Sequence, residues 1–192
     1  MLTIDRTRTA LLLMDFQTDV VPMFERAAPA LAHAAELAAT ARAAGLPVIY
    51  VTVGFRPGYP EISPRNPIFT TVAQAGRFVV GTPGAEVAAG LRPAAGDVVV
   101  VKHRVSAFAG TDLEIVLRAK GIETLILSGV ATSGVVLSTL RQAADADYRA
   151  IVVEDACADR DDEVHRVLTG KVFPRQATVT TTAEVVAALA SA

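Results

Sequence analysis

Two charged residues and one turn follow apolar runs of the sequence, and together they could form a catalytic site. Asp15 and Lys102 each end a run of apolar residues that is long enough for a buried strand. Burial raises the pKa of a carboxyl group and a neighbouring cation offsets that shift, so an acid and an amine in contact can exchange protons with a bound molecule. The alternatives are a structural ion pair and strand-end residues that face solvent.

The third position is the segment 129–136, which follows the apolar run Leu125–Leu127 and contains two glycines. We expect a strand to end here and a helix to begin. The residues of this candidate turn are Ala131, Ser133, Gly134 and Val135. Because the first amides of a helix lack partners within it, the turn is expected to bind an anion or a developing oxyanion. The alternative is an ordinary junction in which glycine allows close packing.

Short apolar runs alternate with alanine-rich segments along the sequence, and this alternation predicts strands and helices in turn. The expected strands are 9–14, 47–53, 97–101, 124–128, 150–154 and 177–180. The expected helices are 25–44, 85–90, 111–120, 134–146, 161–172 and 182–190. Several strand runs are almost unbroken, which is typical of parallel strands that are covered on both faces. The predicted fold class is therefore α/β, a three-layer α/β/α sandwich around a six-stranded, mainly parallel sheet.

Several helix boundaries carry their own signals. The pairs Thr111–Glu114 and Thr181–Glu184 have the spacing of a capping box. Gly45 and Gly121 follow helical segments, where a residue with a left-handed backbone commonly ends a helix. In an open parallel sheet, ligands bind outside the carboxyl ends of the strands, so we expect the acid, the amine and the turn to meet at one crevice.

The composition is that of one globular domain, expected to span residues 1–192. Hydrophobic residues make up 52% of the chain and charged residues 20%, with a formal net charge of −2. This charge gives no reason to expect a nucleic acid or a membrane surface as a partner. A single cysteine allows no internal disulfide, and neither a signal peptide nor a membrane-spanning run is visible. We therefore expect a cytoplasmic protein.

Proline, glycine and aromatic residues crowd the segment 54–83. A long irregular stretch inside a compact domain is usually a functional loop. The aromatic residues of this segment, Phe55, Tyr59, Phe69 and Phe78, indicate an ordered lid or a contact between subunits.

Four stretches of the chain, in this order and spacing, resemble the isochorismatase-like family, whose amidases are cysteine hydrolases. The stretches are 11–17, 102–111, 127–132 and 151–158, and the resemblance extends over residues 7–186. It implies a Rossmann-like sandwich with the strand order 3-2-1-4-5-6. It also implies self-association, as a homodimer or a higher homo-oligomer.

The same resemblance implies roles for individual residues. Asp15 matches the acid–base residue and Lys102 its electrostatic partner. A cis peptide bond that does not involve proline is expected between Val130 and Ala131.

The chain departs from the family's amidases at Val135, where they have the nucleophilic cysteine. A valine side chain cannot attack a carbonyl group, so a thioester at this position is excluded. Cys157 follows the next strand and is expected to be a small buried residue. Ser133 is two positions away from the nucleophile position and would need a general base, so we do not expect it to replace the cysteine.

No metal site and no cofactor are expected. Nicotinamidase-like members of the family bind a metal through Asp and His residues after the second strand, and the segment 51–57 contains neither. His33, His103 and His165 lie on separate expected elements and show no ligand spacing.

Isochorismatases of the same family also lack the cysteine, and they hydrolyse a vinyl ether. We therefore predict a hydrolase that acts on a small carboxylated substrate, with vinyl-ether hydrolysis of the isochorismate type favoured over amide hydrolysis. Arginine binds carboxylates well, and the candidates are Arg56, Arg65, Arg77 and, next to the amine, Arg104. The other expected substrate-binding residues are Gln17, Phe55 and Phe108.

Two other functions are weighed against this prediction. A degenerate paralogue could keep the pocket as a small-molecule-binding protein without turnover. A dinucleotide-binding module would carry a G-x-G-x-x-G turn after the first strand, where this chain has the residues 15–19, so we set it aside.

Overall fold

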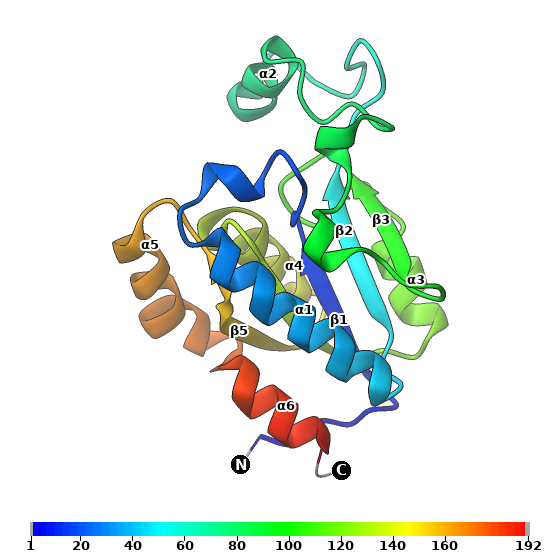
Figure 1. The fold of residues 1–192 in the computed structure, drawn as a ribbon, viewed down its shortest axis with the longest axis vertical. Coiled ribbons are helices and arrows are strands. Elements are labelled where there is room, and N and C mark those ends of the chain that lie inside the picture. Colours follow the sequence, from blue (N-terminus) through cyan, green and yellow to red (C-terminus); the bar gives the residue numbers. More distant parts are fainter. Residues whose placement is uncertain (1, 191–192) are drawn as a thin grey trace.

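A parallel sheet in the order β3-β2-β1-β4-β5-β6 forms the middle of the computed structural model, which describes residues 2–190 (Figure 1). Its six strands are β1 (Thr9–Met14), β2 (Val48–Val53), β3 (Val98–Lys102), β4 (Thr124–Val130), β5 (Arg149–Ala158) and β6 (Thr178–Thr180). The predicted strand order and parallel pairing are confirmed. All residues of β1 and β2 are buried, as unbroken apolar runs predict. The predicted domain ends, residues 1 and 192, lie outside the described residues.

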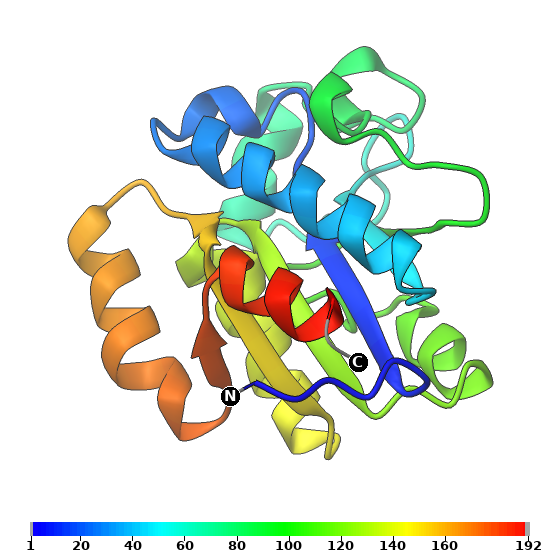
Figure 2. The same cartoon turned by 60° about the horizontal axis from the view of Figure 1, so that its bottom comes forward.

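Helices cover both faces of the sheet and bury one apolar layer on each side. On one face lie α1 (Ala27–Ala43) and α6 (Thr182–Ala190), which Figure 2 shows side by side in front of the strands. On the other face lie α3 (Leu113–Ala119) and α4 (Leu137–Asp145). A further short helix, α5 (Asp162–Val167), follows β5. None of the helices within residues 2–190 is both long and apolar enough to cross a membrane.

The predicted helix boundaries are confirmed in most places. At the start of α6 the Thr181 amide donates to Glu184, and the Glu184 amide donates to the Thr181 hydroxyl, as in a capping box. Gly45 and Gly121 have positive φ angles of 77° and 65°, which end the preceding helices. The prediction for Thr111–Glu114 is wrong in part, because Glu114 forms an ion pair with Arg118 one turn further along α3.

Two segments differ from the sequence-based prediction. The predicted helix 85–90 is absent, and single 3₁₀ turns at Pro83–Ala85 and Ala89–Leu91 replace it. Conversely, a helix inside the segment 54–83 was missed, namely α2 (Pro67–Gln74). Asn66 caps this helix with its side chain and proline stands at its first position, which are both sequence signals of a helix start.

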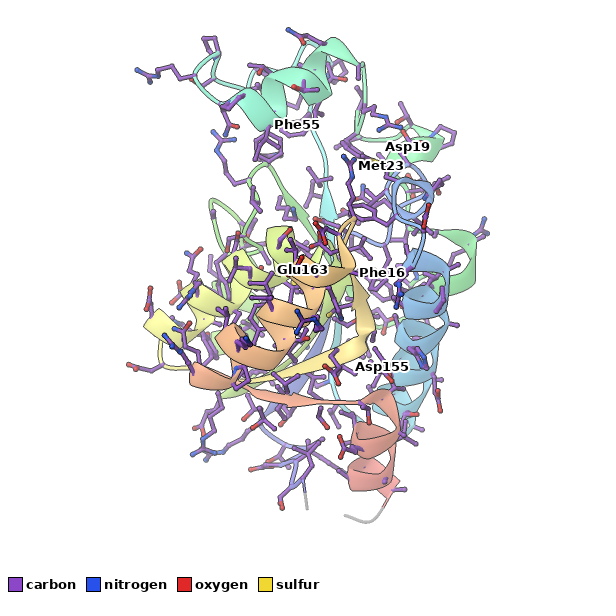
Figure 3. The ribbon with its side chains drawn as sticks, turned by 90° about the vertical axis from the view of Figure 1, so that its left-hand side faces the viewer. Phe16, Asp19, Met23, Phe55, Asp155 and Glu163 are labelled. Atoms are coloured by element: carbon purple, nitrogen blue, oxygen red, sulfur yellow. The ribbon has the colours of Figure 1, made fainter. Side chains whose placement is uncertain are left out.

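The segment that carries α2 is ordered by aromatic and polar contacts. Figure 1 shows α2 apart from the sheet, beyond the end of β2. The Phe55 ring packs against Phe69 of α2 with ring centroids 5.4 Å apart, and Figure 3 shows Phe55 beneath this helix. At the base of the segment, the buried Gln17 amide donates to the carbonyl oxygens of Val53 and Ala85 at 2.8 Å. That this segment is a lid or a subunit contact stays a prediction.

A close approach between β1 and β4 requires glycine at position 129. A Cβ atom on Gly129 would lie 2.8 Å from the Met14 carbonyl oxygen and 3.3 Å from a methyl carbon of Val135. Real Cβ atoms rarely come so near to backbone, so a side chain here would push the turn after β4 away from β1.

Gly129→Ala should therefore destabilise the protein, by about 1–3 kcal/mol, because the added methyl group overpacks a buried site. The matched control is Gly170→Ala, where a Cβ atom would meet no other atom within 4 Å and where alanine favours the helical backbone. Thermal unfolding of both variants measures the difference. Equal melting temperatures for the two would contradict the close approach.

Candidate active site

Asp15 and Lys102 form a buried ion pair at the carboxyl edge of the sheet. The Lys102 Nζ atom lies 2.8 Å from Asp15 Oδ2, and both residues are buried. Asp15 follows β1 and Lys102 ends β3, so the lysine side chain reaches across the end of β2, which lies between them. The Asp15 amide donates to the Val51 carbonyl oxygen at 2.8 Å, and this bond fixes the backbone as it leaves the sheet. The structure thus brings together the two residues predicted for catalysis.

The two carboxyl oxygens of Asp15 have different surroundings. Oδ2 contacts Lys102, whereas Oδ1 is buried and has no hydrogen-bond partner among the described residues. Burial raises the pKa of Asp15 above its ordinary value, and the charge and hydrogen bond of Lys102, with a smaller contribution from the Val53 backbone, offset only part of this rise. The Lys102 ammonium also donates to the Arg104 carbonyl oxygen at 3.1 Å. Asp15 can therefore carry a proton on an oxygen that no protein group occupies.

The turn after β4 has the backbone that the resemblance implied. A cis peptide bond joins Val130 and Ala131, and a wide, π-helical turn, Thr132–Val136, leads into α4. Two of the four candidate amides are engaged within the protein. The Ser133 amide donates to Asp159 Oδ2 at 2.6 Å and the Gly134 amide to the Ala131 carbonyl oxygen at 3.1 Å. The amides of Ala131 and Val135 stay predicted candidates for binding an oxyanion.

Sequence reasoning missed the contacts that hold this turn. Asp159 directly follows β5 at the same edge of the sheet, and its carboxylate accepts from the turn. The Thr132 hydroxyl and Nδ1 of His165, in α5, form a hydrogen bond of 2.8 Å. The signal that identified Asp15, a polar residue directly after a buried strand, also applies to Asp159. No sequence signal indicated the contact of His165.

Val135 is buried against β4 and β1. One of its methyl carbons would lie 3.3 Å from a Cβ atom on Gly129, and the same Cβ would touch Met14, the residue before Asp15. Val135, which the resemblance matches to the nucleophile of the amidases, thus presents methyl groups next to the end of β1. Cys157 pairs with Gly129 in the register of β4 and β5, and burial raises the pKa of its thiol to about 12.

Two of the predicted substrate contacts have other partners. The Gln17 side chain accepts from the Val53 amide at 2.8 Å, in addition to its two donor bonds to backbone, so its amide group joins segments of the chain. The Phe108 ring contacts Tyr148, which directly precedes β5 and so lies at the amino edge of the sheet. Both side chains thus have contacts within the protein, and a role of Gln17 or Phe108 in substrate binding stays a prediction.

Phe55 and Arg104 are the other two predicted substrate contacts. Phe55 is fully buried beneath α2 and also packs against the His103 ring, with centroids 5.9 Å apart. This places it in the support of the segment 54–83. Arg104 is half-buried, follows Lys102 by two residues, and donates from its guanidinium to the His103 carbonyl oxygen. Arg104 keeps its place as a candidate for a substrate carboxylate.

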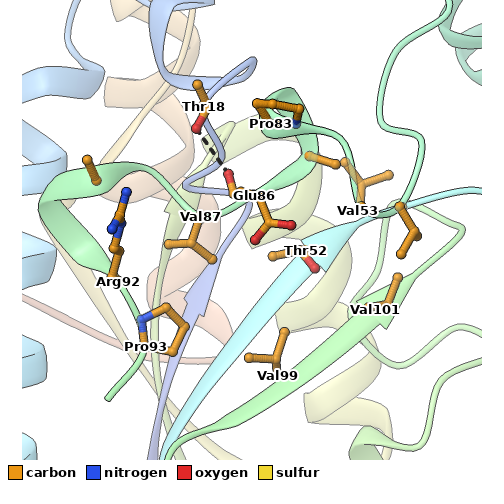
Figure 4. A pocket seen from close by; sticks show the side chains of 15 residues that line it. Thr18, Thr52, Val53, Pro83, Glu86, Val87, Arg92, Pro93, Val99 and Val101 are labelled. Atoms are coloured by element: carbon orange, nitrogen blue, oxygen red, sulfur yellow. Dashed lines mark hydrogen bonds between the residues drawn. The ribbon is translucent and has the colours of Figure 1, made fainter. Parts of the chain in front are cut away.

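A surface groove of about 710 Å³ lies on the sheet near its β3 edge (Figure 4). Its lining comes from the ends of β2 and β3, from the segment 80–93 and from Thr18. Exposed side chains of Val99 and Val101 contribute its apolar surface. The residues described as its lining do not include the ion pair or Val135, so we place the candidate active site at the ion pair.

The pKa of Asp15 predicts how stability depends on pH. The folded protein binds this proton more tightly than the unfolded chain, so the contribution of Asp15 to stability is present in acid and lost as pH rises through the raised pKa. Asp15→Asn, a neutral isostere, should therefore match the parent in acid and exceed its stability in alkaline buffer. Chemical denaturation in both buffers measures this.

The matched variant is Lys102→Met, which leaves the buried carboxylate without its cation. In alkaline buffer it should lower the free energy of unfolding by about 3–5 kcal/mol. If Asp15→Asn lost as much stability in alkaline buffer as Lys102→Met, the ionised pair would be net stabilising. That result would contradict the raised pKa of Asp15.

The isochorismatase domain family matches residues 9–184. The uncharacterized isochorismatase family protein YecD of Escherichia coli O157:H7 is 33% identical over 98% of this chain and 100% of its own length. Maleamate amidohydrolase of Pseudomonas putida is 31% identical over 82% of this chain and 76% of its own length. The crystal structure of a cysteine hydrolase from Pseudomonas syringae pv. phaseolicola 1448A has a TM-score of 0.93 at 28% identity and covers 100% of this chain and 96% of its own. The chain belongs to the isochorismatase family.

Proposed function

We propose that this protein hydrolyses a small carboxylated molecule by acid catalysis from Asp15, without a covalent intermediate on the enzyme. The observation that carries the proposal is the buried Asp15 carboxyl group, with one oxygen on Lys102 and the other free. A raised pKa allows this group to hold a proton and to release it in the reaction. The methyl groups of Val135 offer no nucleophile, so water is the attacking group.

A vinyl ether suits this arrangement better than an amide does. Asp15 would transfer its proton to the terminal carbon of the C=C bond, and the electron pair of that bond would form the new C–H bond. The resulting oxocarbenium ion takes up water, and the water's proton returns to the Asp15 carboxylate. The hemiketal then breaks into a ketone and an alcohol, so that one water molecule is consumed and the enzyme is restored.

The neighbouring groups have supporting roles in this proposal. Lys102 stabilises the Asp15 carboxylate once the proton has left it, which makes the transfer easier. The amides of Ala131 and Val135 are directed at an oxygen of the substrate, and the Arg104 guanidinium pairs with its carboxylate. The protein is proposed to work in the cytoplasm as a homo-oligomer, without a metal or cofactor.

The second candidate function is a binding protein that has lost turnover. The burial of Val135 against Gly129 favours it, because the position of the family's nucleophile is filled by an apolar side chain. Relatives named as amidohydrolases act on amides, and an amide substrate would require the missing nucleophile or a water molecule activated in its place. Binding of small carboxylated molecules without hydrolysis of vinyl ethers, esters or amides would support this second candidate.

Asp15→Asn should lower kcat/KM for a vinyl-ether substrate by about 10²–10⁴-fold, because a general acid is removed. For the parent protein, kcat/KM should fall as pH rises through the raised pKa of Asp15, since only the protonated acid can donate. Steady-state kinetics over a range of pH with an isochorismate-type vinyl ether measures both effects.

The control for this experiment is Asp145→Asn, at the exposed end of α4, which should retain the parental activity and pH profile. Activity that survives Asp15→Asn would remove this residue from the mechanism. A rate that rises with pH over the same range would make Asp15 a base and contradict acid catalysis.

Val135→Cys tests the surroundings of the missing nucleophile. If Lys102 and the free amides of the turn stabilise negative charge, the introduced thiol should have a lowered pKa and alkylate about tenfold faster than an ordinary thiol at neutral pH. Iodoacetamide labelling followed by mass spectrometry measures the rate. The parent protein is the control, because its Cys157 thiol is buried and has a strongly raised pKa. Reaction at the rate of glutathione would show that the surrounding groups do not act on this position.

A further inference from the structure

The turn that carries the candidate oxyanion amides is held by two side chains that the proposed reaction does not use. Asp159 Oδ2 accepts from the Ser133 amide at 2.6 Å. The Thr132 hydroxyl is hydrogen-bonded to Nδ1 of His165 at 2.8 Å. Consecutive residues of the turn are therefore fixed by separate elements, one by the end of β5 and the other by α5.

The strand order shows from which side these contacts come. In the sheet, β4 lies between β1 and β5, and β3 lies beyond β1. Asp15 and Lys102 therefore approach the turn from the β1 side, whereas Asp159 and His165 approach it from the β5 side. The turn lies between the reacting groups and the groups that hold it.

Burial strengthens the hydrogen bonds that Thr132 and Asp159 make. Thr132 is fully buried, and Asp159 is also buried. Hydrogen bonds in such surroundings are stronger than in water, and a charged acceptor strengthens the bond further. Asp159 Oδ1 in addition accepts from the Arg160 amide at 2.9 Å, so both of its oxygens are engaged and its direction is set.

The shape of the turn gives these contacts a consequence for the site. The segment Thr132–Val136 is a π-helical turn, and the amides of Gly134 and Val136 both donate to the Ala131 carbonyl oxygen, at 3.1 and 3.3 Å. A π-helical turn departs from the regular α-helical bonding pattern, so contacts from outside the turn can set the direction of its amides. The Ala131 amide adjoins this turn and the Val135 amide belongs to it, and within residues 2–190 neither donates to a side chain.

We propose that Asp159 and His165 are positioning residues, which fix the direction of the Ala131 and Val135 amides through Ser133 and Thr132. The inference rests on the proposed function, because it assigns the turn a role in stabilising charge. It extends that function by two residues that touch no substrate.

An alternative reading is that Asp159 acts by its negative charge, which would weaken the positive end of the turn. The two readings give opposite results for conservative variants. Asp159→Asn keeps an oxygen acceptor for the Ser133 amide but removes the charge, whereas Asp159→Ala removes both. His165→Asn keeps a polar atom near the place of Nδ1, whereas His165→Ala does not.

In this experiment each substitution is added to Val135→Cys, which is the reference protein here, and two quantities are measured for each variant. The first is the alkylation rate of the introduced thiol with iodoacetamide, and the second is hydrogen exchange of the peptide that contains residues 130–137. We expect Asp159→Ala and His165→Ala to slow alkylation and to speed exchange by about 10- to 100-fold. Asp159→Asn and His165→Asn should stay near the parental values.

If Asp159→Asn and Asp159→Ala had equal effects, Asp159 would act by its charge and not by positioning the turn. If hydrogen exchange were unchanged in both alanine variants, neither Asp159 nor His165 would position the turn. If Asp159→Ala does not fold, Thr132→Val removes the other contact and Thr132→Ser is its control. If the thiol of Val135→Cys alkylates slowly while hydrogen exchange follows the expected pattern, the result counts against the proposed function and not against positioning. The two failures are therefore distinguishable.

Discussion

The site depends on one interaction, the contact between a carboxyl group and an ammonium group that the fold removes from water. Asp15 and Lys102 come from strands that are not neighbours, and only the common carboxyl edge of a parallel sheet brings them within 2.8 Å. Desolvation outweighs the attraction of the lysine, so the pair favours a protonated acid more than an exposed aspartate would. A protein gains little stability from such a pair. We propose that the pair serves to hold a proton that Asp15 can donate and take back.

The rest of the edge of the sheet is arranged around this acid. Gly129 allows β4 to approach β1 at the last residue pair of their register, Met14 and Gly129, and the turn follows shortly after. Val135, which the resemblance matches to the nucleophile position, is buried and lies beside Gly129 with methyl groups only. In the function that we propose, the buried acid and the amides of the turn serve a reaction that begins with proton transfer.

Much of this arrangement could be predicted from the sequence because it depends on local patterns. Unbroken apolar runs gave the strands, and the polar residue after each run gave the ion pair. The remaining features depend on tertiary contacts that no local pattern determines. The segment 85–90 has a helical composition but forms only 3₁₀ turns, and the capping signals of α2 were hidden in a proline-rich stretch. Gln17 and Phe108 lie close to Asp15 and Lys102 in the sequence, but their contacts are with distant residues. Gln17 bonds to backbone that is 36 or more residues away. Phe108 packs against Tyr148, at the amino edge of the sheet.

The most direct test of the account is the protonation of Asp15 itself. The carboxyl carbon of this residue can be followed by ¹³C NMR during a pH titration, with Asp15→Asn used to assign its signal. We expect a midpoint above 3.8, the ordinary value, and a further rise in Lys102→Met, because the lysine lowers the pKa of Asp15. A midpoint at or below the ordinary value would show that the lysine holds the acid ionised, and acid catalysis by Asp15 would then be contradicted.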